Sequence, residues 1–271
     1  MSRIIVQPLG GLCNRMRAIV GAVSLAKKTG KQIAILWTHD CTLNAGFSDL
    51  FEPITYEVIE CSLTSLKYKA LYHWYKDVKR YMILDDQWIL ANARGKEYVT
   101  WKYIIENKDL FLQTSHDILF DGDYSLLKPR MSVINELYGV VCDHNTIGLH
   151  IRRTDNANAI KYSPTNLFFE KVEEELKKDP QVKFYLATDD PQEEQSFIDK
   201  FGQSILVYKK HSLDRNNPLA IKEALVDLCN LSHCRKIYGS YWSSFSDTAA
   251  LWTGIEKIEL KNDSFNYHTG I

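Results

Sequence analysis

The sequence lacks several features that would assign it to common classes of protein. No apolar run reaches the roughly 20 residues of a membrane-spanning helix, and the first residues lack the apolar core and cleavage region of a signal peptide. Charge of one sign is not in surplus either, because 33 Lys and Arg residues face 34 Asp and Glu residues, for a net charge of −1. A broad electrostatic surface for nucleic acid or for an anionic membrane is therefore excluded, and any anion site must be local.

Familiar cysteine and phosphate motifs are also missing. The six cysteines contain no C-x-x-C pair, which favours a reducing, cytoplasmic setting. Cys229, His233 and Cys234 lie in a helical pattern without a second pair of ligands, so we interpret them as core residues. No GxxxxGK[ST] loop exists, which argues against the common phosphoryl-transfer enzymes. The "DGD" at 121–123 resembles the metal-holding Asp-x-Asp of another glycosyltransferase fold, but it also fits an ordinary turn, and we expect no metal cofactor.

What the sequence does contain is an α/β pattern, which begins near the N-terminus. The stretch 3–7 predicts a strand, 14–28 a helix that Gly30 ends, and 32–37 a second strand. Gly10 and the glycine after it form the connecting turn. Such a turn presents backbone N–H groups and a helix N-terminus to an anion, although the arrangement is common and weak evidence alone.

The second half alternates strands and helices over short connections. We expect strands at 146–151, 183–187, 205–209, 236–239 and 257–260, and helices at 164–178, 191–201, 218–234 and 245–252, with Ser163 as the N-cap of the first. Alternation of this kind predicts a parallel sheet covered on both faces. We therefore predict two domains, 1–140 and 141–271, with the border between 135 and 146.

The region 60–140 is less regular and rich in Tyr, Trp and Lys. The aromatic side chains of 68–88 could stack on a sugar acceptor, but at helical spacing they are more often core, and we favour the core interpretation.

Polar residues gather where three strands of the second half end. Ligands of open parallel sheets bind at the carboxyl ends of the strands. Guanidinium groups, hydroxyl groups and a helix N-terminus on one rim suit a diphosphate. Structural alternatives exist, because the arginines could pair with the aspartates in an ion network and the serines could only cap a helix. The residues are His150, Arg152, Arg153, Thr188, Asp189, Asp190, Ser240, Ser243, Ser244 and Ser246.

Asp227 is a second clue. It lies at the edge of the predicted buried stripe of 218–234, where a carboxylate loses hydration unless it accepts hydrogen bonds. Guanine offers two adjacent donors, N1–H and the 2-amino group, that suit one carboxylate. The alternative is an exposed aspartate at the margin of the stripe, and both interpretations stay open.

Four motifs together resemble a known family. "HIRRTD" (150–155), "YLATDDP" (185–191), "LVDLCNLS" (225–232) and "SYWSSFS" (240–246) occur in this order in α-1,6-fucosyltransferases, relatives of the α-1,2- and protein O-fucosyltransferases, and the bacterial members are most similar. "GGLCNRMRAI" (10–19) resembles the glycine loop of that superfamily. The similarity is strong over 147–254, moderate over 1–40 and not seen over 41–140.

The resemblance implies a GT-B-type α/β fold, in which two Rossmann-like domains with parallel sheets face a cleft. It also implies an inverting, metal-independent transfer of L-fucose from GDP-β-L-fucose. On matching positions, Arg152 would bind the diphosphate and stabilise the departing charge, and Asp227 would read guanine. The remaining donor-binding positions would be His150 and Arg153 at the nucleotide, Ser243 and Ser244 at the phosphates, Phe245 as a further substrate-binding residue, Asp189 and Asp190 in support, and Gly10, Gly11 and Asn14 from the other domain.

The general base is where this sequence departs from the family. The core-fucosylation enzyme carries a Lys and a Glu shortly after the arginine motif, whereas here "NANAIKYS" (156–163) holds no carboxylate. Asp155 is our catalytic candidate, and Asp40 or Glu60 is the alternative.

These observations predict a bacterial-type fucosyltransferase in surface-polysaccharide assembly. Its partners would be GDP-fucose and a glycan or glycolipid acceptor, without nucleic acid, and it would work in the cytoplasm, at the inner face of the membrane if the acceptor is lipid-linked. Two alternatives are an enzyme of the same fold that uses another nucleotide sugar, and a non-catalytic protein that binds a GDP-sugar or a glycan.

Overall fold

The chain divides into two compact units. The computed structural model describes residues 2–93, 98–137, 142, 145–214 and 216–262. Unit 1 comprises Met1–Glu136 with Ser212–Leu225, and unit 2 comprises Leu137–His211 with Val226–Ile271. The domain border that we predicted after residue 140 lies outside the described residues.

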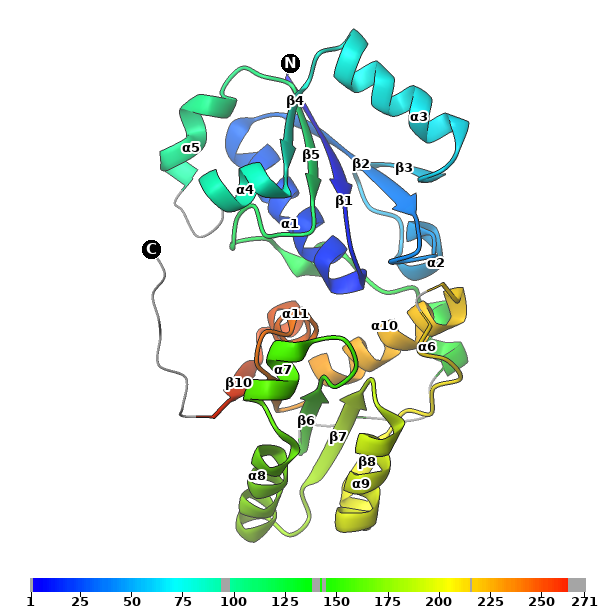
Figure 1. Cartoon of the computed structure of the whole chain (residues 1–271), viewed down its shortest axis with the longest axis vertical. Helices are drawn as coiled ribbons and strands as arrows, with labels where there is room; N and C mark the ends of the chain where they lie inside the picture. The colour runs from blue at the N-terminus through cyan, green and yellow to red at the C-terminus, as the bar shows by residue number, and fades with distance from the viewer. Residues whose placement is uncertain (1, 94–97, 138–141, 143–144, 215, 263–271) are drawn as a thin grey trace. The chain divides into compact units, whose positions relative to one another are not determined.

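Unit 1 is built on an all-parallel sheet with the order β3-β2-β1-β5-β4 (Figure 1). Its strands are β1 (Arg3–Pro8), β2 (Gln32–His39), β3 (Glu57–Ser62), β4 (Met82–Asp85) and β5 (Leu110–Thr114). Its helices are α1 (Leu12–Thr29), α2 (Phe47–Leu50), α3 (Leu66–His73), the π-helical turn η1 (Trp74–Val78), α4 (Asp86–Asn92), α5 (Tyr98–Ile105), the short η2 (Tyr124–Leu126) and α6 (Met131–Leu137).

The predicted N-terminal β-α-β arrangement is confirmed. The helix α1 ends at Gly30, whose φ of 64° is the left-handed conformation that glycine adopts without strain. On the sheet, Ile5, Leu36 and Phe111 pack against the inner face of α3 and η1, including Tyr75. The core interpretation is therefore confirmed for Tyr68, Tyr72 and Tyr75. The region 60–140, which we described as less regular, contains β4 and β5 and the end of β3, so it supplies strands of the sheet that the sequence did not reveal.

Unit 2 is a second all-parallel sheet, with the order β10-β9-β6-β7-β8 (Figure 1). Its strands are β6 (Thr146–Ile151), β7 (Lys183–Thr188), β8 (Ile205–Val207), β9 (Lys236–Ser240) and β10 (Glu256–Leu260). Its helices are α7 (Ala157–Tyr162), α8 (Thr165–Lys178), α9 (Pro191–Phe201), the short η3 (Gly202–Ser204), the second half of α10 (Pro218–Ser232) and α11 (Ser244–Thr253).

Alternation along β6 decides which side chains face which helices. Ile147, Leu149 and Ile151 share a core with Phe168 of α8 and with α9. The residues between them point to the opposite face of the sheet, because successive side chains of a strand alternate. His150 therefore faces the side of the sheet covered by α10 and α11.

One predicted helix start was wrong. The N-cap of α8 is Pro164, and the hydroxyl of Ser163 is used elsewhere. It donates to the carbonyl of Leu260 at 2.5 Å and accepts the N–H of Tyr241 at 2.7 Å. The helix α7 before it was not foreseen. Among the described residues, no helix is both long and apolar enough to cross a membrane.

Candidate functional site

The carboxyl ends of β6 and β9 bring the first site residues together. His150 on β6 is the register partner of Gly239 on β9. A Cβ at Gly239 would lie 2.6 Å from Ser246 Oγ, so only glycine lets the first turn of α11 approach β9 this closely. Ser240 Oγ donates to the His150 carbonyl at 3.3 Å and accepts the N–H of Arg152 at 3.1 Å. The start of α11 and the segment after β6 are thereby held side by side.

His150 is a buried side chain with an unused hydrogen-bonding atom. Its ring is 5% exposed and stacks on Phe245, with centroids 5.0 Å apart and planes 22° from parallel. Its Nδ1 has no hydrogen-bond partner among the described residues. Burial, helped by the charge of Arg152, lowers the pKa of His150 to about 3, so the ring is neutral at pH 7. Because buried polar atoms are normally paired, this nitrogen marks a position where a ligand can supply the partner.

Arg152 lies beside this histidine in an ion network at the surface. Its guanidinium is 3.0 Å from Asp189 Oδ2 and also forms a hydrogen-bonded ion pair with Asp155. The side chain of Arg152 is 22% exposed, and that of Asp155 is 52% exposed. An exposed ion pair contributes little stability, whereas a guanidinium binds a diphosphate through two aligned hydrogen bonds. Arg152 can therefore exchange Asp155 for a phosphate at low cost.

Arg153, in contrast, is packed into unit 2. Its NH2 lies 3.2 Å from Glu193 Oε1 and donates to Thr165 Oγ1 at 3.3 Å, and its guanidinium carbon lies 5.9 Å from the centroid of the Phe168 ring. Only a tenth of the side chain is exposed. The adjacent arginines thus have different surroundings, and Arg153 holds α8 and α9 together.

The N-terminus of α11 completes the rim. Ser243 is the N-cap, but its side chain makes no capping hydrogen bond, so Ser244 and Phe245 begin the helix without a side-chain acceptor for their N–H groups. The preceding Trp242 is 61% exposed and adopts a φ of 57°, and Asn156 Nδ2 donates to its carbonyl at 2.9 Å. An uncapped helix N-terminus favours an anion.

Two aspartates at the end of β7 organise the loops around the rim. Asp189 accepts the N–H of Arg153 at 2.7 Å and the hydroxyl of Thr154 at 2.7 Å. Burial raises the pKa of Asp189, but the hydrogen bond from Thr154, the charge of Arg152 and the backbone donors outweigh it, and the net pKa is lowered. Asp190 caps α9 by accepting the N–H of Gln192 at 2.8 Å. Both carboxylates have structural partners.

Asp227 is buried, not an exposed aspartate at the helix margin. It is 5% exposed and accepts the hydroxyl of Tyr185 at 2.5 Å on one oxygen, while Lys210 Nζ lies 2.9 Å from the other. Asn230 Nδ2 donates to the same tyrosine hydroxyl at 3.1 Å. Burial and the neighbouring carboxylate raise the pKa of Tyr185 well above 10. Both oxygens of the Asp227 carboxylate therefore have a donor in this structure.

The glycine turn of unit 1 is shaped for close approach. Gly10 has a φ of 75°, and a Cβ there would lie 2.9 Å from Asn14 Nδ2. Gly11 is the N-cap of α1 and has no side chain to occupy the helix N-terminus. The Asn14 side chain is half-buried beside this turn.

Arg15 is the residue behind this turn that our sequence analysis missed. It is fully buried, donates from Nε to the Gly10 carbonyl at 2.7 Å, and pairs with Asp40 at 2.9 Å. Its guanidinium carbon lies 5.0 Å from the centroid of the Trp37 ring. Burial lowers the pKa of Arg15, and Asp40 opposes that effect. A signal was present, because an arginine directly before Met16 falls within the apolar face of the helix.

The three candidate bases differ in how they are engaged. Asp40 pairs with Arg15 and accepts the N–H of Thr42 at 2.7 Å. Glu60 accepts the backbone N–H of Phe47 and Ser48 at the start of α2, at 3.0 and 3.1 Å. Asp155, half-exposed beside Arg152, is the one of the three that adjoins the rim of unit 2.

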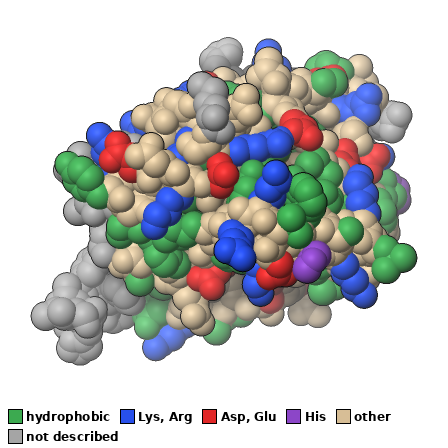
Figure 2. Space-filling view, turned by 90° about the horizontal axis from the view of Figure 1, so that it is seen from above, with side chains coloured by type: hydrophobic (Ala, Val, Ile, Leu, Met, Phe, Trp, Pro, Cys, Tyr) green, Lys and Arg blue, Asp and Glu red, His purple; other side chains and the backbone are tan. Residues whose placement is uncertain are grey.

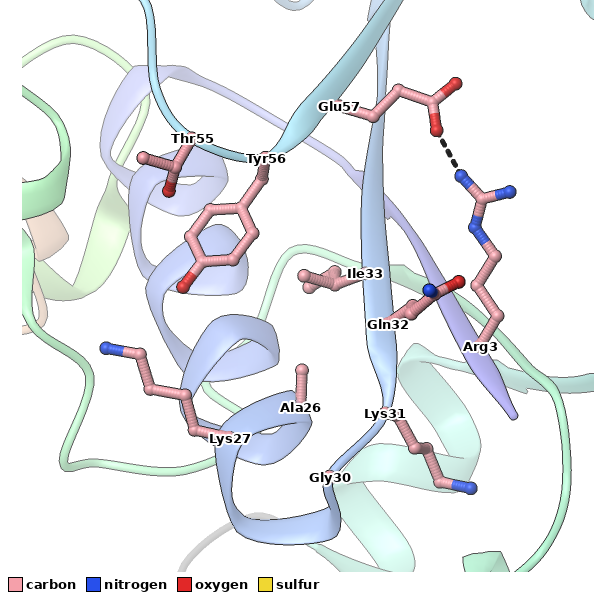
Figure 3. A pocket seen from close by; sticks show the side chains of 10 residues that line it. All are labelled: Arg3, Ala26, Lys27, Gly30, Lys31, Gln32, Ile33, Thr55, Tyr56 and Glu57. Carbon is pink, nitrogen blue, oxygen red and sulfur yellow. Dashed lines mark hydrogen bonds and ion pairs between the residues drawn. The ribbon is translucent and has the colours of Figure 1, made fainter. Parts of the chain in front are cut away.

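A cavity of about 540 Å³ lies elsewhere in unit 1, between the amino ends of β2 and β3 and the end of α1 (Figure 3). Arg3 and Glu57 close one side with an ion pair, and Lys31 Nζ is held by the Lys108 carbonyl at 2.9 Å. Ligands of parallel sheets bind at the opposite, carboxyl ends. Size alone therefore does not make this cavity the candidate site.

The residues that we considered as possible metal ligands have other partners. Asp121 of "DGD" pairs with Lys28 at 2.8 Å, and Asp123 caps η2. Burial raises the pKa of Cys229 to about 12, and Cys234 is also buried, so the core interpretation is confirmed for both cysteines. It was wrong for His233, which is exposed and whose Nδ1 lies 2.7 Å from the Cys229 carbonyl. Within the described ranges, no group of three His, Cys, Asp or Glu residues could hold a metal ion.

Comparison with known proteins adds evidence on the fold. No family model matches the chain, and no curated protein matches it in sequence. NodZ α-1,6-fucosyltransferase soaked with GDP-fucose is similar in structure, with a TM-score of 0.59 and 18% identity over 93% of each chain. A variant of Arabidopsis thaliana FUT1 in complex with GDP has a TM-score of 0.59 and 11% identity, over 95% of this chain and 70% of that one.

POFUT1 in complex with GDP-fucose is a third similar structure, with a TM-score of 0.52 and 9% identity over 96% of this chain and 97% of that one. These proteins come from the superfamily that the sequence motifs resemble. The predicted fold class is confirmed: the chain has the GT-B-type α/β fold of the fucosyltransferases, with two all-parallel five-stranded sheets.

Proposed function

We propose that this protein is a glycosyltransferase that moves L-fucose from GDP-β-L-fucose to a hydroxyl of a carbohydrate acceptor. Its fold is that of fucosyltransferases solved with GDP or GDP-fucose. Fold alone does not define function, so the argument depends on the site.

The observation that carries the proposal is the combination of groups at the rim of unit 2. Arg152 is partly exposed, the N-terminus of α11 is uncapped, and the buried His150 has a ring nitrogen without a partner. The first two attract an anion, and the third supplies a polar contact next to it. A nucleoside diphosphate has both an anionic diphosphate and an adjacent polar nucleoside. Asp227 is our guanine-reading residue, because its carboxylate is buried in the same unit.

The chemistry follows from these charges. The acceptor oxygen forms a bond to C1 of fucose while the bond from C1 to the phosphate oxygen breaks, and the electron pair leaves with GDP. Attack from the opposite face inverts the configuration. Arg152 and the first N–H groups of α11 stabilise the growing charge on the diphosphate, which is the role that a metal has in other enzymes. Gly10, Gly11 and Asn14 provide backbone and amide donors for the sugar nucleotide from unit 1.

Asp155 is the base in this scheme. In this structure Asp155 is paired with Arg152. When Arg152 turns to the diphosphate, that contact is lost, and the carboxylate accepts the proton of the acceptor hydroxyl. Donor binding and activation of the base are thereby coupled through one arginine.

The acceptor is proposed to be a glycan or glycolipid, and the reaction to take place in the cytoplasm at the membrane. The six cysteines are thiols and not disulfides, which supports a reducing compartment. A lipid-linked acceptor would bring the protein to the membrane surface.

The test first compares how much GDP and UDP stabilise the protein, and then measures turnover of GDP-fucose. GDP at about 100 times its Kd should add about 2.7 kcal/mol to the free energy of unfolding, whereas UDP should add nothing at the same concentration. Stabilisation by UDP alone would remove the guanine role of Asp227. GDP-fucose with a panel of oligosaccharides should then yield GDP and a fucosylated product.

A non-catalytic GDP-sugar-binding protein is the second candidate. The engagement of Asp40 and Glu60 in unit 1 favours it, because neither carboxylate is available as a base. GDP binding without consumption of GDP-fucose, with every acceptor of the panel, would establish this alternative. Binding and consumption of a different GDP-sugar would keep the enzyme and change its donor.

A further inference from the structure

The helix α3 and the turn η1 expose a second apolar face that the sheet does not use. Their inner face, with Tyr68, Leu71, Tyr72 and Tyr75, packs on the core of unit 1. Their outer face repeats apolar residues every four positions. These are Leu66, Ala70, Trp74 and Val78, of which the three large ones are 82%, 47% and 51% exposed. We call these four residues the outer stripe.

The outer stripe gathers exposed apolar residues at a spacing of four, which makes successive members neighbours on the helix surface. Single exposed apolar residues are common in folded proteins, but an ordered row along one helix face is typical of a surface that another molecule covers. The helix already has its core contacts, so its packing on the sheet does not require these residues. A tryptophan within such a row is the residue that favours a boundary between water and an apolar phase.

Basic side chains flank the outer stripe. The segment 66–80 contains Lys67, Lys69, Lys76, Lys79 and Arg80, all exposed, against the single acid Asp77, which pairs with His73 at 2.8 Å. The whole chain has a net charge of −1, so this excess is local. Lys79 Nζ lies 5.2 Å from the centroid of the Trp74 ring, and Lys76 Nζ lies 5.5 Å from that of Tyr72. Figure 2 shows lysine and arginine side chains beside hydrophobic ones on the face that it views.

We propose that the outer stripe and its basic flank dock on an anionic lipid surface. Apolar side chains of an interfacial helix enter the boundary between headgroups and acyl chains, while lysines extend their ammonium groups to the phosphates. Positive charge next to the apolar row selects a membrane over a second copy of this chain, because two copies would bring like charges together. The inference deepens the lipid-linked acceptor part of the proposed function and needs no assumption about the donor.

The test is co-sedimentation of the full chain with vesicles. We expect the protein to bind vesicles of phosphatidylcholine with phosphatidylglycerol, and to bind vesicles of phosphatidylcholine alone at least about tenfold less. Added salt should weaken the binding. Two double variants probe the two components: Lys69→Glu with Lys76→Glu for charge, and Leu66→Gln with Trp74→Gln for apolar insertion. Each should lower binding at least about tenfold.

Matched controls lie elsewhere on unit 1. Lys108→Glu with Lys128→Glu makes the same change in net charge at exposed lysines, and Phe120→Gln removes another exposed apolar side chain. These variants should bind as the parent protein does. GDP binding, measured separately, should be equal in all of these variants. A failure of the vesicle-binding proposal can therefore be distinguished from a failure of the proposed donor binding.

Three results would overturn the proposal. The protein could ignore both kinds of vesicle, or the control variants could lose as much binding as the stripe variants. Sedimentation velocity could also show a dimer that the Leu66 and Trp74 variant abolishes, which would make the outer stripe an interface between copies of the chain.

Discussion

Two adjacent arginines have different surroundings in this protein, and the separate tasks that we propose for them are measurable. Arg152→Ala removes a charged donor at the rim, and we expect GDP affinity to fall about tenfold to hundredfold, since a hydrogen bond to a charged group contributes about 1.5–3 kcal/mol. Arg153→Ala leaves Glu193, itself 10% exposed, without its cation, and should cost about 3 kcal/mol of folding stability.

Calorimetric titration with GDP and urea unfolding of both variants provide the measurements. Arg153→Ala should keep near-normal GDP affinity under conditions where it is folded. A result in which Arg152→Ala loses stability but retains GDP affinity would assign Arg152 to the structural ion network instead.

His150 predicts a pH dependence of stability. Its folded-state pKa of about 3 lies below the ordinary 6.5, because burial disfavours the charged ring. Between these values the unfolded chain binds a proton that the folded chain does not, so the free energy of unfolding decreases as pH falls below 6.5. The slope from this residue is at most about 1.4 kcal/mol per pH unit. Carboxylates whose pKa folding lowers act below their ordinary values, 3.8 for Asp189 and 4.5 for Glu175, whereas burial raises the pKa of Glu194, which opposes the histidine slope above pH 4.5.

Urea unfolding at several pH values between 5 and 7 measures this slope. His150→Gln should flatten it, because the variant has no buried imidazole to keep neutral. His73→Gln is the control, since it removes an exposed imidazole. Equal slopes in all three proteins would show that His150 can be protonated in the folded state.

At the level of residues, the sequence motifs predicted a cluster of polar residues at the rim of unit 2. They did not show that Arg152 and Arg153 have different partners. The motif around 150–155 located the rim, but the partners of Arg153 are Thr165 and Glu193, which follow much later in the chain. Neighbours along a chain that leaves a strand can point to different sides, and only the packed structure decides which. Arg15 was missed although it falls within the apolar face of its helix, because its carboxylate partner Asp40 lies 25 residues later in the chain.

At the level of elements, the placement of α11 depends on one glycine. Gly239→Ala would put a Cβ 2.6 Å from Ser246 Oγ and push the start of the helix away from β9. We expect a loss of about 1–3 kcal/mol of stability and a clear loss of GDP affinity, because the helix N-terminus would move from the anion. Thermal unfolding and GDP titration test both effects.

Gly254 at the other end of α11 is the matched control. Its φ of 76° makes Gly254→Ala strained, but open space surrounds the new Cβ. That variant should lose about 1 kcal/mol of stability and retain GDP affinity. Equal losses of affinity in both variants would mean that general weakening of α11, not the position of its N-terminus, controls binding.

The elements of unit 2 were easier to predict than those of unit 1. Strands such as β6 are buried along their whole length and separated by helices with clear apolar faces. In unit 1, β3 is only half-buried and β4 has four residues, so neither forms the apolar run by which a buried strand is recognised. The tyrosines that cover this sheet also carry polar tips, which made α3 look irregular in sequence.

At the level of the whole molecule, positive and negative charges nearly cancel in sum. The net charge of −1 hides the proposed anion site in unit 2 and a local excess of basic residues on α3 and η1 in unit 1. Composition could therefore exclude broad electrostatic partners but could not locate either feature. The fold class was predictable because parallel β-α units repeat in both halves, whereas the return of Ser212–Leu225 to unit 1 has no signature in sequence.

If both units contribute to the donor site, nucleotide and sugar should protect different parts of the chain from amide hydrogen exchange. GDP should slow exchange in 150–156 and 240–246, which form the rim of unit 2. GDP-fucose should protect these segments and also 10–14, where Gly10, Gly11 and Asn14 are proposed to meet the sugar nucleotide. At about 100 times Kd the slowing should be about 100-fold for openings that release the ligand. Equal protection of 10–14 by GDP and GDP-fucose would assign the glycine turn to the nucleotide, and no protection there would confine the donor to unit 2.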